Sequence, residues 1–167
     1  MATQTGSSAQ QLNREVVAIV TGGSTPTGRE AARGLAGWGW AIVVVYLEHQ
    51  PRAEATVAEI IAAEGTTVAV RADLADDLDV QRLFTESIAA FGGVDVVVHT
   101  TTESAALLYQ YAARHVHQRG AIVSISACEP IEPEVASQLR ARGIVVGRAP
   151  PEAVLSFLDR WWRRAID

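Results

Sequence analysis

Short apolar runs alternate along this chain with stretches in which apolar residues recur every three or four positions. The runs are rich in valine and isoleucine, as strands covered on both faces are; they span residues 16–20, 41–46, 67–70, 94–98, 121–126 and 144–146. Strands that alternate with helices form a parallel sheet with right-handed crossovers. The pattern predicts an α/β fold, a doubly wound parallel sheet of about six strands in the order 3-2-1-4-5-6.

The helical stretches set the expected domain organisation. In the second half of the chain we expect one helix over residues 103–118, a short one over 133–142 and a last one over 152–166. The first residues are rich in Thr, Ser, Gln and Gly and show no periodicity. This composition predicts a disordered tail over residues 1–12, followed by a single domain over 13–167.

The last helix carries two adjacent tryptophans. Successive helical residues are about 100° apart, so both rings cannot face the core. Trp162 aligns with Leu155 and Leu158 on the apolar stripe, which leaves Trp161 at the flank. An exposed tryptophan is a common anchor of protein interfaces. We therefore expect a homo-oligomer anchored by Trp161; the alternative is that Trp161 folds over a neighbouring loop.

A glycine-rich turn follows the first apolar run. Gly22 and Gly23 allow a tight turn, and Gly28 allows the next helix to pack close to the strand. Backbone N–H groups and the positive end of the helix dipole then lie where a pyrophosphate could bind. The candidate binding residues of this turn are Gly22, Ser24, Thr25 and Gly28.

The turn resembles the Thr-Gly-x-x-x-Gly-x-Gly motif of the short-chain dehydrogenase/reductase family. Thr21, Gly22 and Gly28 match that motif, but Pro26 replaces its middle glycine and Thr27 its bulky aliphatic residue. Proline has no N–H and adds a ring where the bare backbone should meet a phosphate. The motif thus favours the family's Rossmann-like fold more than it favours the family's cofactor binding.

The resemblance covers about residues 14–160, with two internal losses. Residues 71–74 match the segment whose Asp-hydrophobic pair, here Asp73 and Leu74, contacts adenine in family members. Residues 91–98 match the stretch that leads to the family's Asn-Asn-Ala-Gly, which is His99-Thr-Thr-Thr here. The segments that carry the family's active-site Asn and its Tyr-x-x-x-Lys are shortened. Both shortened segments belong to helices that commonly form the family's subunit interface.

The catalytic residues that the resemblance implies do not appear in place. The family uses Tyr as acid/base, Lys to lower the pKa of that Tyr, Ser to bind the substrate carbonyl and Asn to order water. All 14 basic residues here are arginine, so lysine is absent, and the one asparagine is Asn13 in the tail. The family's Ser falls at Ala127, one residue after Ser126. None of the three tyrosines, at 46, 109 and 111, lies in the right segment.

We therefore expect a degenerate relative without the family's redox chemistry, a binding, accessory or non-redox pathway protein with an unidentified small-molecule or protein partner. The alternative is an NAD(P)-dependent oxidoreductase with a rearranged site that uses His99 or Ser126. His99 follows the fourth strand, near the point where open α/β sheets bind ligands. It could serve as an acid/base or ligand group, or as a hydrogen-bonded loop histidine. Ser124 and Cys128 flank Ser126 as small residues at a strand end.

Cofactor binding is expected to be absent or weak for both NAD and NADP, because of Pro26. The expected remnant of the pocket consists of Gly22, Ser24, Thr25, Gly28, Asp73, Leu74 and His99. The sequence does not indicate a clear preference between NAD and NADP. Tyr46 ends the second strand where NAD-preferring members carry Asp, and Thr25 stands where many NADP-preferring members carry Arg.

Composition excludes several other classes of function. The net charge of −5 and the lack of a basic run argue against a nucleic-acid surface. The apolar runs are too short to span a membrane, and the N-terminus lacks the pattern of a secretion signal. Cys128 is the only cysteine, which fits a reducing cytoplasm, and no Cys/His cluster has the spacing of a metal site.

Overall fold

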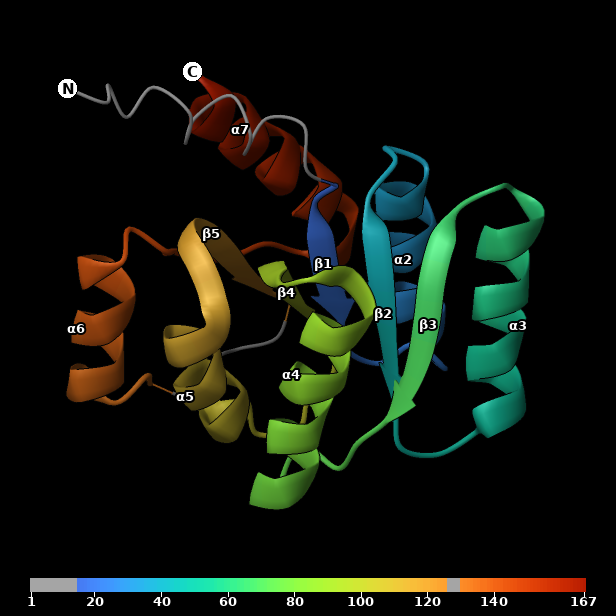
Figure 1. The fold of residues 1–167 in the computed structure, drawn as a ribbon, viewed down its shortest axis with the longest axis horizontal. Helices are drawn as coiled ribbons and strands as arrows, with labels where there is room; N and C mark the ends of the chain where they lie inside the picture. The colour runs from blue at the N-terminus through green and yellow to red at the C-terminus, as the bar shows by residue number, and fades with distance from the viewer. Residues whose placement is uncertain (1–14, 126–129) are drawn as a thin grey trace, which may run out of the picture.

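A computed structural model describes residues 15–125 and 130–167, and its centre is a parallel sheet (Figure 1). The six strands lie in the order β3-β2-β1-β4-β5-β6, and every neighbouring pair is parallel. Their bounds are β1 (Val17–Val20), β2 (Ala41–Tyr46), β3 (Thr66–Arg71), β4 (Val94–His99), β5 (Val116–Ser124) and β6 (Val145–Arg148). This confirms the fold and strand order that the apolar runs predict.

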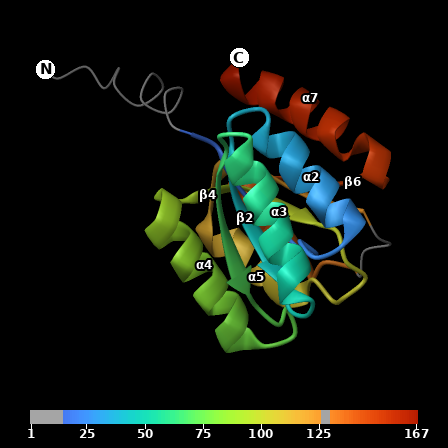
Figure 2. The same ribbon diagram turned by 90° about the vertical axis from the view of Figure 1, so that its right-hand side faces the viewer.

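Helices cover both faces of the sheet (Figure 2). One layer contains α2 (Pro26–Ala36), α3 (Gln50–Ala62) and α7 (Val154–Ile166). The other contains α4 (Asp77–Phe91), α5 (Ala106–His115) and α6 (Pro133–Ala141). A single 3₁₀ turn, η1 (Pro151–Ala153), leads into α7. The result is a three-layer arrangement with one apolar core on each side of the sheet.

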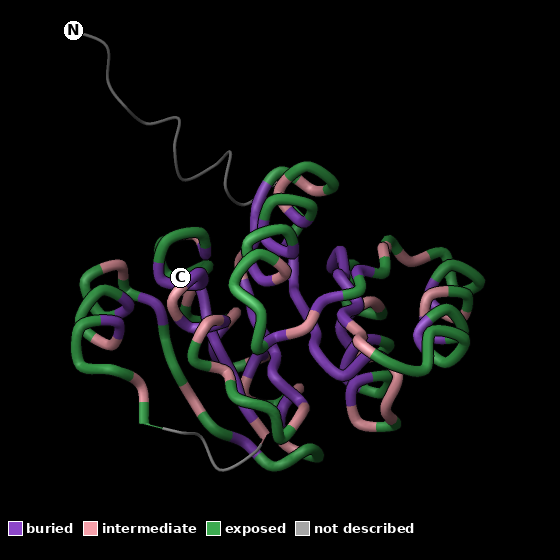
Figure 3. The backbone as a smooth tube through the Cα atoms, turned by 90° about the horizontal axis from the view of Figure 1, so that it is seen from below, coloured by how far each residue is buried: buried purple, intermediate pink, exposed green. Residues whose placement is uncertain are grey.

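Alternate strand residues supply the two cores. Val17 and Ile19 of β1 face α4 and α5, whereas Ala18 and Val20 face α2 and α7. All four residues are buried, because successive side chains of a strand point to opposite faces and both faces are covered. Figure 3 shows buried backbone in the central strands and exposed backbone on the outer sides of the helices.

The region between β4 and β5 differs from the sequence-based expectation. The helix expected over residues 103–118 is shorter, because α5 ends at His115 and β5 begins at Val116. Val116 is fully buried and pairs with Val94. Arg119 then adopts a left-handed conformation with φ 66°, and a Cβ at Gly120 would collide with the carbonyl of Asp95. The helix therefore ends where the tertiary contacts of residues 116–120 require it, although the apolar periodicity of the sequence continues further.

The orientation of α7 corrects the expectation for Trp161. Trp161 is only 8% exposed and lies on one stripe with the buried residues Val154 and Leu158. Its indole N–H donates to the carbonyl oxygen of Arg119 at 3.0 Å, and its ring stands edge-on to Trp40. Trp162 is the half-buried residue of the pair. The expectation of an exposed anchor at Trp161 is wrong, so it no longer supports self-association.

We expect Trp161→Ala to lower the free energy of unfolding by about 3–5 kcal/mol, as truncation of a buried tryptophan does. The matched control is Trp38→Ala, because Trp38 also stands edge-on to Trp40 but is 42% exposed. Its cost should be about 1 kcal/mol. Urea denaturation measures both variants, and equal costs would contradict the buried position of Trp161.

Candidate functional site

A cavity of about 270 Å³ opens at the carboxyl ends of the first four strands. Its wall includes Gly22, Ser24 and Thr25 from the turn after β1. Beyond β2 the wall is formed by residues 45–49, beyond β3 by Ala72 and Leu74, and beyond β4 by Thr101 and Glu103. In the strand order β2-β1-β4 the chain leaves β1 in one direction and later returns to its other side. Such a switch point is where open α/β sheets bind ligands.

The turn after β1 is compressed against its surroundings. Gly22 has a φ of 66°, and a Cβ there would collide with Thr100 Oγ1. A Cβ at Gly28 would collide with the carbonyl oxygen of Gly22. The buried Thr56 hydroxyl of α3 donates to the carbonyl of Gly23 at 2.9 Å. These contacts hold the start of α2 against the end of β1, with glycine required at two positions.

The first turn of α2 leaves one backbone donor for a ligand. Thr25 Oγ1 accepts the N–H of Gly28 at 3.2 Å and donates to the carbonyl of Gly22 at 2.7 Å. Pro26 occupies the first helical position and has no N–H. Only Thr27 in this first turn keeps an N–H for which the described residues provide no acceptor. The helix dipole points its positive end toward the cavity edge.

His99 lies beneath this edge in a closed hydrogen-bond chain. Its Nε2 is 3.0 Å from the carbonyl of Glu103, which can only accept, so Nε2 carries the proton. Its Nδ1 then accepts from Thr21 Oγ1 at 3.0 Å, and Thr21 Oγ1 in turn accepts the N–H of Thr100 at 2.9 Å. Both ring nitrogens are therefore used within the protein.

Burial favours the neutral form of His99. The residue is 2% exposed, and burial lowers its pKa below the ordinary value for histidine, although the bond to the carbonyl of Glu103 opposes that shift. A buried, neutral histidine with both nitrogens occupied ties β1 to β4. This geometry matches the hydrogen-bonded loop histidine that the sequence offered as one alternative, and it leaves no open ring nitrogen for acid/base chemistry.

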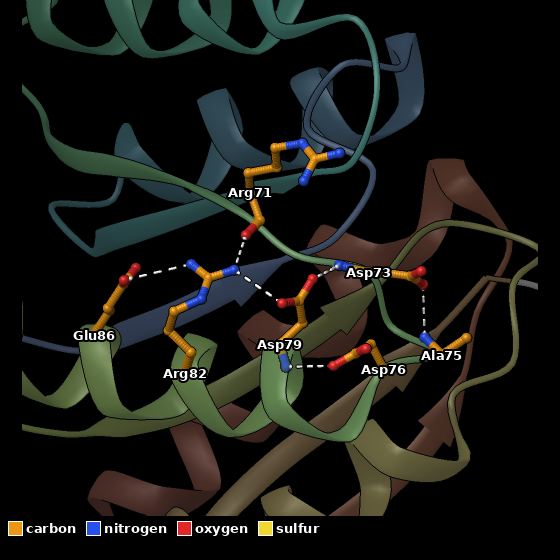
Figure 4. Close-up of polar contacts among 7 residues, drawn as sticks. All are labelled: Arg71, Asp73, Ala75, Asp76, Asp79, Arg82 and Glu86. Carbon is orange, nitrogen blue, oxygen red and sulfur yellow. Dashed lines mark hydrogen bonds and ion pairs between the residues drawn. The ribbon is translucent and has the colours of Figure 1, made fainter.

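The segment after β3 is organised by carboxylates (Figure 4). The backbone N–H of Asp73 donates to Asp79 Oδ2 at 2.8 Å, and this bond, with help from Arg82, lowers the pKa of Asp79 against the opposing effect of burial. Arg82 also donates to the carbonyl of Arg71 at 2.6 Å. Asp73 Oδ1 accepts the N–H of Ala75 at 2.9 Å. Asp73 thus shapes the turn outside the cavity lining, whereas its neighbour Leu74 lies in the wall.

The expected site residues separate into three groups. Gly22, Ser24, Thr25 and Leu74 line the cavity. Gly28, Asp73 and His99 are not in the lining, but each adjoins or bonds to a residue that is, namely Thr25, Leu74 and Glu103 respectively. Ser126, together with Ala127 and Cys128, lies outside the described residues. Ser124 is buried beside His99 in the sheet, and its hydroxyl has no hydrogen-bond partner among the described residues.

Sequence reasoning missed Glu48 and His49 of the cavity wall. His49 precedes α3 in a left-handed conformation, with φ 57°. Glu48 stands 20 residues after Gly28. An acidic residue at about that distance after a glycine-rich turn is a known signal for ribose recognition, so the sequence did contain this clue.

Two other kinds of site are absent from residues 15–125 and 130–167. No group of three or more His, Cys, Asp or Glu side chains there could hold a metal ion. In the same part of the chain, no helix has the length and apolarity to cross a membrane.

Comparisons with known proteins show similarity to short-chain dehydrogenases and reductases. The family model described as short chain dehydrogenase matches residues 16–107. A 3-oxoacyl-[acyl-carrier-protein] reductase from Synechocystis is 40% identical over 83 residues, which cover 50% of this chain but only 34% of that reductase. The short-chain dehydrogenase/reductase homolog YusS from Bacillus subtilis is 36% identical over 86 residues, covering 52% of this chain and 79% of YusS.

A solved structure is similar over more of the chain. It is a short chain dehydrogenase from Burkholderia cenocepacia in complex with NADP, with a TM-score of 0.70 and 27% sequence identity. The similarity covers 82% of this chain and 74% of that one. It therefore extends beyond the segment matched by the family model, into the shortened second half.

We expect His99→Gln to lower the free energy of unfolding at pH 8 by about 1–3 kcal/mol, because it breaks a buried hydrogen-bond chain. The difference should narrow as the pH falls below about 6.5, where the unfolded wild-type chain gains a proton before the folded chain does. Urea titrations across this pH range measure it. His49→Gln, at an exposed histidine, is the control and should cost less than half as much. A pH-independent difference for His99→Gln would contradict a neutral His99.

Proposed function

This chain belongs to the short-chain dehydrogenase family, and from that premise we propose that it binds a nicotinamide dinucleotide in the cavity at the carboxyl edge of its sheet. The cavity itself is the observation that carries the proposal. It lies at the switch point of the sheet, between a glycine turn without room for side chains and the ends of β2, β3 and β4. When bound, such a cofactor supplies a hydride donor or acceptor.

The residues present fit such a ligand. The close packing around Gly22 leaves bare backbone at the turn, and the N–H of Thr27 with the hydroxyl of Ser24 would hold phosphate oxygens. Ala72 and Leu74 offer an apolar wall to the adenine. Glu48 would accept a hydrogen bond from a ribose hydroxyl. Pro26 removes one N–H from this site without closing it.

The first candidate activity is that of an NAD(P)-dependent oxidoreductase with a rearranged active site. The names of the relatives support this class, because the similar proteins are called reductases and dehydrogenases, and one solved relative is in complex with NADP. The relatives' substrates do not transfer to this chain, since the matched segment covers only 34% of the Synechocystis reductase.

The second candidate is dinucleotide binding without hydride transfer. The sequence contains no lysine, which the family's acid/base tyrosine requires as a partner, and its one asparagine is Asn13. His99 has both ring nitrogens occupied. These observations favour a protein that recognises the cofactor in a binding or accessory role.

One experiment separates the two candidates. Calorimetric titration with NAD and NADP measures binding, and consumption of reduced cofactor with a panel of aldehydes and ketones measures turnover. Binding with turnover supports the oxidoreductase, and binding without turnover supports the second candidate. Failure to bind either cofactor would overturn the proposed function.

We expect Pro26→Gly to raise the affinity for NAD about fivefold, because glycine restores a backbone N–H worth about 1 kcal/mol at the phosphate turn. Pro133→Gly is the matched control, because Pro133 occupies the first turn of α6 on the other face of the sheet. Its effect on NAD affinity should be negligible. An unchanged affinity in Pro26→Gly would mean that no phosphate approaches this turn.

Glu48 also predicts a preference between the two cofactors. Its carboxylate favours the ribose hydroxyl of NAD and repels the 2′-phosphate of NADP, and the lining contains Glu103 but no arginine or lysine. We expect Glu48→Gln to shift the ratio of the two dissociation constants toward NADP by about fivefold. Glu64→Gln, at an exposed position outside the cavity, should leave that ratio unchanged. An equal shift in both variants would contradict a specific role for Glu48.

A further inference from the structure

A second cavity, of about 340 Å³, lies at the other end of the strands, where β5 and β6 begin. It is formed between the amino-terminal ends of β5 and β6 and the last turns of α7. In Figure 1 the arrowheads of β2 and β3 point away from the end of α7 that carries the C-terminus. This cavity is therefore separate from the proposed dinucleotide site, with which it shares no lining residue.

The charge of its lining is unusual for this chain. Three arginines, Arg119, Arg160 and Arg164, line the cavity, and no lining residue is acidic. Within the part of the chain that the structure describes, none of the three forms an ion pair, whereas the adjacent Arg163 binds Asp159 at 2.9 Å. The whole protein carries a net charge of −5. Three guanidinium groups without an ion pair among the described residues thus line one cavity of a protein whose net charge is negative.

The backbone of Arg119 is held in place. Its N–H donates to the carbonyl of Arg142 at 3.0 Å, and its own carbonyl accepts the indole N–H of Trp161 at 3.0 Å. Its φ of 66° is uncommon for a residue with a side chain and costs free energy. A Cβ at Gly143 would lie 3.7 Å from Arg119 Cγ, in ordinary contact. Gly143 thus forms the floor beneath the arginine side chain.

The α7 side of the cavity combines charge with apolar surface. Residues 157, 160, 161 and 164 are spaced three and four apart, so they share one face of the helix. Phe157 and Trp161 add aromatic surface to the same face. Val145 of the edge strand β6 closes the apolar wall and is 45% exposed. The lining therefore offers a cationic rim beside an aromatic and aliphatic interior.

We propose that this cavity binds a small amphipathic anion, a carboxylate or phosphate monoester with an apolar body. Guanidinium groups form charge-assisted, often bidentate hydrogen bonds with these headgroups. Arg160 and Arg164 hold the headgroup together with Arg119, and the apolar body packs on Phe157, Trp161 and Val145. The binding free energy has two contributions. The anion is attracted to the three arginines, and its apolar body covers apolar surface of the cavity.

The test uses four probes that share an eight-carbon chain. Octanoate and octyl phosphate carry the two candidate headgroups, octanol lacks a charge and octylammonium reverses it. Calorimetry gives the affinities, and quenching of tryptophan fluorescence reports occupancy beside Trp161. Both anions should bind saturably, more weakly at high salt, and at least tenfold more tightly than octanol or octylammonium. The tighter of the two anions identifies the headgroup class.

The variants assign the binding to this cavity. Arg160→Gln combined with Arg164→Gln should weaken both anions about tenfold or more, and Arg119→Gln should weaken them separately. Arg163→Gln is the matched control, because Arg163 lies on the same helix turn, bears the same charge and is absent from the lining. It should change affinity less than twofold. All four arginines are exposed, so their replacement leaves the folded core intact, which circular dichroism verifies.

Three outcomes would overturn the proposal. The first is no saturable binding of either anion. The second is equal affinity for octanol, which would mean an apolar surface without anion recognition. The third is equal weakening by Arg163→Gln, which would mean general attraction to the basic end of α7.

Discussion

The close approach of α2 to the end of β1 is the constraint on which the candidate site depends. The carbonyl of Gly22 lies where a side chain at position 28 would begin, so only glycine allows the helix to start there. This contact brings the first turn of α2 to the carboxyl edge of the sheet, beside the ends of β2 and β4. Thr56 from α3 and Thr100 after β4 then lock the turn from two sides. The cavity lies between this turn and the segments that follow β2 and β4.

At the other edge, a cluster of tryptophans has the corresponding role. Trp40 directly precedes β2, and its ring contacts the rings of Trp161 and Trp162 of α7 edge-on. Edge-to-face pairs add to the free energy gained by burial. The cluster fixes the last helix across the amino-terminal ends of the strands, so that the face of α7 bearing Arg160 and Arg164 meets the bend at Arg119. The two edges of one sheet are thus organised by different means, a glycine contact and an aromatic cluster.

Much of the fold could be predicted from sequence, because strands buried on both faces are continuous apolar runs. The end of α5 could not, since the apolar spacing continues to Val116 while the bend depends on contacts of Gly120 and Arg119 with distant residues. The position of Trp161 was predicted wrongly for a related reason. Its burial depends on a carbonyl acceptor 42 residues away and on Trp40, neither of which appears in the periodicity of its own helix.

The candidate site was partly predictable for similar reasons. The glycine turn identified Gly22, Ser24 and Thr25, because local backbone requirements leave a signature in sequence. Burial of His99 between Thr21 and the carbonyl of Glu103 depends on two segments about 80 residues apart and could only be offered as one alternative. Glu48 was missed although it stands 20 residues after Gly28, because the acidic position of NAD-preferring relatives corresponds to Tyr46, at the end of the strand.

The left-handed backbone of Arg119 has a consequence for how this protein can change. Glycine is the residue that adopts such a conformation at the lowest steric cost, and replacing a strained residue by one that fits its backbone commonly stabilises a protein. With arginine at position 119, the folded protein is less stable than it would be with glycine there, by on the order of 1 kcal/mol. In return, a guanidinium group lies at the rim of the second cavity. Selection for thermal stability alone would therefore drive this position toward glycine and dismantle the cationic rim.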